Sequence, residues 1–163
     1  MILCFDSLRD MDFAQLMEVY EEGNRCNGKK LYSLESEAQQ LLLAGQDFED
    51  YLRRDFFAQK GAQYFVLEEG GRYVSALRVE HYKDWLILCA METKPDCRLR
   101  GYAKRLLEGV LKQLNSPVYS HISKRNKTSI CVHQACGFLK LHDGARYLDG
   151  SVNAMADTYV YRK

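Results

Sequence analysis

Residues 98–104, with the sequence RLRGYAK, combine a glycine with three basic side chains at the start of a predicted helix. The first backbone N–H groups of a helix have no partner inside the helix and carry partial positive charge, so they can bind a phosphate. Gly101 has no Cβ that would keep a ligand away from the backbone. The pattern therefore indicates a local phosphate site, with a solvated helix start as the plainer alternative. Its residues are Arg98, Leu99, Arg100, Gly101, Tyr102, Ala103 and Lys104.

A second segment, NKTSICVHQACGF (126–138), has the ends of a short helix, with Asn126 at its start and Gly137 after its last turn. Together, R-x-x-G-x-A at 98–103 and this segment resemble the two coenzyme-binding signatures of the GNAT acetyltransferases, over about residues 62–163. His133 stands where a Tyr is commonest in that family, and some branches similar to the phosphinothricin acetyltransferases have His there.

The resemblance implies an N-acetyltransferase that uses acetyl-CoA as co-substrate and acetylates a primary amine by direct attack in a ternary complex. It also implies that the strand ending near residue 93 parts from its neighbour and offers its backbone to the coenzyme arm. The expected coenzyme-binding residues are Met91, Glu92, Thr93, Arg98, Leu99, Arg100, Gly101, Tyr102, Ala103, Lys104, Asn126, Ser129 and His133.

Aminolysis of a thioester needs a base for the amine and an acid for the departing sulfur. His133 is the expected acid, since imidazole titrates near neutral pH, and a histidine packed on the inner face of its helix is the alternative. Glu92 is the expected base; the alternatives are a solvated carboxylate at a strand end, a partner for Lys94, or proton loss through water. Cys89 suits a buried thiol better than an acyl-cysteine intermediate. Cys131, His133 and Cys136 lack a further ligand cluster, so no metal site is expected.

The elements that must position these residues follow from hydrophobic periodicity. Apolar residues at helical spacing predict helices near residues 13–20, 34–42 and 48–52, with Gly23 and Gly45 as stops and Asp47 as an N-cap. Three strand-like runs follow at 62–69, 72–80 and 85–92, the first two joined by a glycine turn. A long helix is predicted at 103–114, then a strand at 118–122, a helix at 126–136 and strands at 138–142 and 157–163. The expected fold is α+β, GNAT-like, with a mixed, largely antiparallel sheet and helices on both faces.

Composition narrows the functional class. The 163 residues carry a formal net charge of +1 and suit one domain, 1–163, in which residues 1–61 are mainly helical and shape the acceptor site. Balanced charge argues against a nucleic-acid binder, and no apolar run is long enough to cross a membrane. The start of the chain lacks the pattern of a signal peptide and the six cysteines form no C-x-x-C pair, which favours a cytoplasmic protein with reduced thiols.

Three functions stay open at this point. The first is an enzyme that acetylates a small-molecule amine or a protein amino group, as a monomer or homodimer. The second is a non-catalytic acyl-CoA-binding sensor, and the third is a protein-interaction module that uses the aromatic N-terminal helices.

Overall fold

One seven-stranded sheet forms the central layer of the molecule. The computed structural model describes residues 1–163, and its strands lie in the order β1-β2-β3-β4-β5-β7-β6. Neighbouring strands are antiparallel except for β4 and β5, which are parallel. The strands are β1 (Ile2–Phe5), β2 (Gln63–Glu69), β3 (Arg72–Tyr82), β4 (Trp85–Thr93), β5 (Val118–Ser123), β6 (Leu139–Arg146) and β7 (Val152–Tyr161).

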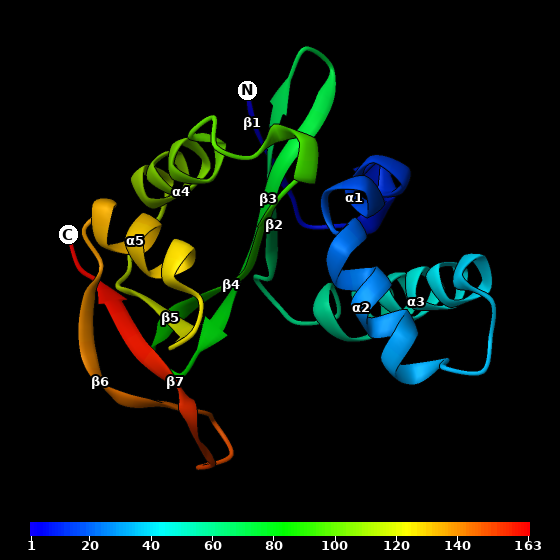
Figure 1. The fold of residues 1–163 in the computed structure, drawn as a ribbon. Helices are drawn as coiled ribbons and strands as arrows, with labels where there is room; N and C mark the ends of the chain where they lie inside the picture. The colour runs from blue at the N-terminus through cyan, green and yellow to red at the C-terminus, as the bar shows by residue number, and fades with distance from the viewer.

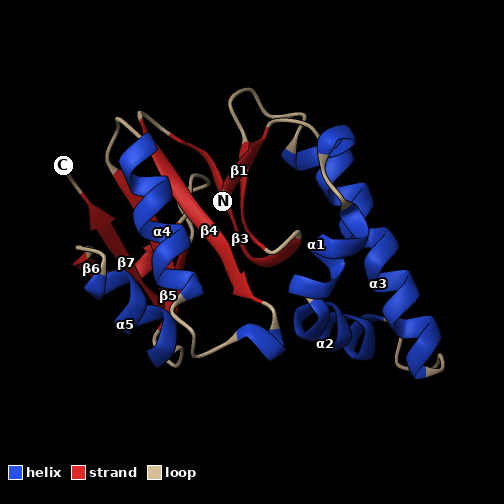
Figure 2. Ribbon diagram, turned by 90° about the horizontal axis from the view of Figure 1, so that it is seen from above, coloured by secondary structure: helices blue, strands red, loops and turns tan.

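Helices cover both faces of this sheet, as Figures 1 and 2 show. Those on one side come from the first third of the chain: α1 (Phe13–Val19), α2 (Glu21–Leu31) and α3 (Glu37–Tyr51). Those on the other side are α4 (Tyr102–Gln113) and α5 (Lys127–Ala135). Short helical turns occupy Leu8–Asp10, Leu52–Phe56 and Pro95–Cys97. The predicted α+β class, with a mixed, largely antiparallel sheet, is confirmed.

The two faces of the sheet belong to two separate cores, which explains the unbroken apolar run in β2. Successive side chains of a strand point to opposite faces. Phe65 and Leu67 therefore pack in the core beneath α4, whereas Tyr64 and Val66 pack beneath α1 and Phe56. All four β2 residues are at most 1% exposed. β2 is thus buried on both faces and contributes side chains to both cores.

The N-terminal third differs from its predicted form in three ways. Residues 2–5 form an edge strand, β1, which pairs with β2 and was not predicted. The helices predicted at 34–42 and 48–52 are one continuous helix, α3, and Gly45 lies inside it. A Cβ at Gly45 would lie 2.9 Å from Met17 Cε, so the glycine allows α1 to pack closely on α3 and does not stop the helix. Gly23 likewise lies inside α2.

Candidate functional site

The central strands part in the middle of the sheet. β4 and β5 pair only at Leu86 with Val118 and at Ile87 with Tyr119, and beyond these residues the two strands diverge (Figure 1). The later part of β4 therefore has a free backbone edge, as the resemblance implied. A bulge lies in the same stretch, where Ala90 has φ 51° and the β3–β4 register shifts. The Tyr20 hydroxyl donates to Ala90 O at 2.6 Å and holds the bulge from the helical side.

The loop between β4 and α4 leaves a run of backbone donors without partners. Leu99 and Gly101 have φ of 62° and 78°, and Gly101 is the N-cap of α4 without a side-chain capping bond. None of the N–H groups from Leu99 to Lys104 has an acceptor within the protein; the first bond of the helix is Arg105 N to Gly101 O. Successive free N–H groups at a helix start form a concave anion-binding surface.

These donors open onto a cleft of about 640 Å³. The cleft joins three separate segments, which are the end of β4, the loop into α4, and the start of α5. Its lining residues are Met91, Glu92, Thr93, Cys97, Arg98, Leu99, Gly101, Tyr102, Ala103, Lys104, Asn126, Thr128, Ser129 and Val132. Of the residues expected from the sequence, only Arg100 and His133 do not line it. Cys97, Thr128 and Val132 were not expected; the four-residue spacing of Thr128 and Val132 on a helix was the available signal for the last two.

The basic side chains of the loop differ in what they contact. Arg98 donates to Thr93 O at 3.2 Å, and its guanidinium lies 2.7 Å from Glu22 and 3.9 Å from Glu92. Its charge is thus directed to carboxylates of α2 and β4. Lys104 lies 3.6 Å from Glu108 on its own helix, and Arg100 is exposed. The backbone N–H groups of the loop, together with Lys104, are therefore the groups of this cleft that are best placed to bind an anion.

Glu92 combines a position in the cleft with a perturbed carboxyl group. Burial raises its pKa, while nearby Arg98 lowers it and Glu22 raises it. A raised pKa makes a carboxylate a stronger base. The strand end is fixed from behind by Ser75, whose hydroxyl donates to Glu92 O at 2.6 Å and lies 3.0 Å from Thr93 Oγ1.

His133 lies behind the cleft wall. Its side chain is 2% exposed and packs edge-on against Phe138, with ring centroids 4.9 Å apart. Nδ1 lies 2.8 Å from Ser129 O, and Nε2 lies 3.1 Å from the Ser120 hydroxyl. A carbonyl only accepts, so Nδ1 carries the hydrogen and Nε2 of the neutral ring accepts from Ser120. Burial lowers the pKa of the imidazole. This arrangement favours the packed histidine, and an acid role for His133 stays a prediction.

The remaining residues of the later signature have structural roles as well as cleft positions. Asn126 caps α5, and its side chain accepts from Ser129 N at 3.0 Å. The structure contains no group of three or more His, Cys, Asp or Glu side chains that could hold a metal ion. It also contains no helix that is both long and apolar enough to cross a membrane.

The model of the acetyltransferase (GNAT) family matches residues 28–138, which is more than half of the chain. The chain belongs to the GNAT family. It is therefore an acetyl-CoA-dependent N-acetyltransferase, and acetyl-CoA is its co-substrate. No curated protein sequence matches this GNAT protein.

Solved structures with the same fold include several acetyltransferases. The PaiA N-acetyltransferase of Thermoplasma acidophilum, in complex with coenzyme A, superposes with a TM-score of 0.66 at 13% identity, covering 100% of this chain and 99% of its own. An acetyltransferase of Thermus thermophilus gives 0.64 at 18% identity, covering 98% and 96%. The ribosomal-protein-S18-alanine N-acetyltransferase of Escherichia coli gives 0.58 at 15%, covering 98% and 91%. At sequence identities of 13–18%, the similarity of this chain to these structures concerns the fold alone.

Proposed function

We propose that this GNAT protein acetylates a primary amine by direct attack on the thioester of acetyl-CoA, with both substrates bound together. The observation that carries the proposal is the run of free N–H groups from Leu99 to Lys104, which opens onto a cleft that continues to the free edge of β4. A diphosphate fits the free N–H groups, and a chain with amide groups fits the free edge of β4.

The cleft orients the co-substrate. With the diphosphate at the start of α4, the coenzyme arm extends along Met91–Thr93 toward the point where β4 and β5 join. A backbone N–H of β4 there stabilises negative charge on the thioester oxygen. Holding both substrates in this geometry removes about 7 kcal/mol or more of the entropic barrier in well-aligned cases.

The reaction forms a C–N bond and breaks a C–S bond, with one proton leaving nitrogen and one reaching sulfur. Glu92 is the proposed base, supported by its cleft position and raised pKa. His133 meets the cleft only through Ser129, whose hydroxyl lines it and lies 3.3 Å from Nδ1. A proton from the imidazole would therefore have to pass through the Ser129 hydroxyl.

The oligomeric state of the protein and its cytoplasmic location stay predictions.

Two glycines allow a matched test of the anion site. Gly101 and Gly71 both have positive φ, 78° and 76°, and a Cβ at either would meet no atom within 4 Å. Alanine at each site therefore brings a similar strain of about 1–2 kcal/mol, but only Gly101 belongs to the cleft. Acetyl-CoA at 100 times its Kd stabilises a folded protein by about 2.7 kcal/mol.

We expect acetyl-CoA to raise the Tm of the wild type and of Gly71→Ala, and to raise that of Gly101→Ala much less. Equal ligand-induced shifts in both variants would remove the loop from the coenzyme site. Tight binding of acetyl-CoA without turnover on a broad amine panel would instead favour a non-catalytic sensor.

A further inference from the structure

Arg78 on β3 is held inside the protein without a carboxylate partner. Five other arginines also lack a carboxylate within 4 Å, and all of them are exposed, whereas Arg78 is largely buried. Its Nε is fully buried and has no hydrogen-bond partner. Removing a guanidinium from water without a counter-ion is costly. The protein thus holds a guanidinium in a largely buried position and provides no carboxylate to neutralise its charge.

Aromatic rings hold this guanidinium in place. Its central carbon lies 5.0 Å from the ring centre of Tyr51 and 5.4 Å from that of Phe56, which is cation–π geometry. Glu80, two residues along β3, does not pair with Arg78, and instead its carboxylate accepts from Cys89 Sγ at 3.2 Å. Aromatic contacts therefore hold the guanidinium of Arg78, while its Nε keeps a free hydrogen-bond donor.

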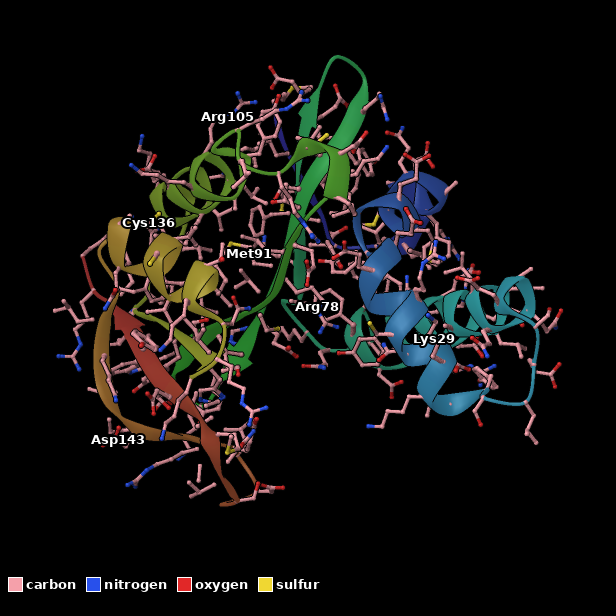
Figure 3. The ribbon with its side chains drawn as sticks, viewed as in Figure 1. Lys29, Arg78, Met91, Arg105, Cys136 and Asp143 are labelled. Carbon is pink, nitrogen blue, oxygen red and sulfur yellow. The ribbon has the colours of Figure 1, made fainter.

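Arg78 lies across β4 from the coenzyme cleft. It is opposite Cys89 in the β3–β4 register, one residue before the bulge at Ala90. Met91 packs on the other side of β4, in the core beneath α4, and Figure 3 shows Met91 and Arg78 on opposite sides of the strand. β4 and β5 pair only at Leu86–Val118 and Ile87–Tyr119, so the stretch of β4 opposite Arg78 has no strand on its other edge.

We propose that the acceptor is a small amine that also carries a carboxylate, and that Arg78 binds this carboxylate through its planar fork of N–H donors. This inference rests on the proposed function and specifies its acceptor. A single guanidinium, over the rings of Tyr51 and Phe56 and opposite Cys89, matches a singly charged carboxylate. Glu80 lies on the same face of β3, where it attracts the ammonium form of the incoming amine.

The test uses pairs of α- and ω-amino acids and their carboxamides as acceptors, with acetyl-CoA as donor. The amine of a carboxamide is less basic, so a larger fraction of it is the free nucleophile at neutral pH, and a preference for the acid comes from binding and not from the supply of free amine. We expect kcat/KM of the wild type to favour the acid by about 30-fold or more in the preferred pair. Arg78→Gln should remove this preference by lowering kcat/KM for the acid alone, and Arg78→Lys should retain part of it.

Arg9→Gln is the matched control, because Arg9 is exposed and also lacks a carboxylate partner. It should leave the acid preference unchanged. The inference is overturned if the wild type uses acid and carboxamide equally, or if Arg78→Gln lowers both equally. An acetyl-CoA-induced rise in Tm without acetylation of any pair also overturns it, while the coenzyme site stands. Absence of that rise overturns the proposed function as well.

Discussion

Replacing His133 by alanine separates a packing role from an acid role, because the two predict changes in different quantities. Truncation removes a ring that is 2% exposed and leaves a cavity between α5, Phe138 and Ser120. Large-to-small changes in a core cost about 2–5 kcal/mol, and the Ser120 hydroxyl, itself 3% exposed, loses its partner at a further cost of about 1 kcal/mol. We expect a loss of about 3–6 kcal/mol, or roughly 6–24 °C in Tm for a chain of this length.

An essential acid would instead contribute about 10²–10⁴-fold to the rate. Stability is measured by urea unfolding, and kcat is measured at saturating acetyl-CoA, well below the Tm of the variant. With the histidine in a packing role, kcat of the folded variant should fall less than about 10-fold. Ser120→Ala is the control, since it removes the partner of Nε2 but leaves the ring in place. A kcat loss above about 100-fold with stability within about 1 kcal/mol of wild type would refute the reasoning.

Three further predictions follow from perturbed pKa values. Burial lowers the pKa of both His133 and His121, so below about pH 6.5 the unfolded chain binds more protons than the folded protein does. The free energy of unfolding should therefore be constant above about pH 7 and fall toward pH 5, by at most about 1.4 kcal/mol per pH unit for each histidine. A free energy of unfolding, measured with urea, that does not change between about pH 7 and pH 5 would contradict this. Glu92→Gln should lower kcat by about 10²-fold or more while the Kd of acetyl-CoA, from calorimetry, stays the same; an unchanged kcat assigns proton removal to water. Burial raises the pKa of Cys89 to about 12, so iodoacetamide should label the exposed Cys131 of the native protein and spare Cys89; rapid labelling of Cys89 would reopen the acyl-cysteine route.

The strands and helices of the later chain could be predicted because their signals are local. β2, β3 and β4 begin and end within two residues of their predicted bounds, since continuous strand-like runs bounded by tight turns determine them. β1 was missed because four residues at a chain start carry no period, and only pairing with β2 makes them a strand. Gly45 was mistaken for a helix stop because its reason, close contact with Met17, lies in another helix.

Residues of the site also divide into those with a local sequence signal and those whose setting depends on distant parts of the chain. Residues of the loop before α4 were found from their composition, and all of the predicted loop residues except Arg100 line the cleft. The position of His133 could not be judged from the sequence, since Ser120 on β5 supplies one of its two hydrogen bonds. Arg78 gave no signal at all, because its setting depends on a cross-strand register and on rings from residues 51 and 56.

The parting of β4 and β5 leaves a strand edge with unused hydrogen-bonding groups in the interior of a folded protein. Such an edge ordinarily invites another polypeptide to add a strand. Here α4 and α5 flank the edge on one side, and the helices of the first third of the chain flank it on the other (Figure 2). In the proposed complex, the amide groups of the coenzyme arm lie along this edge and take the place of the missing strand.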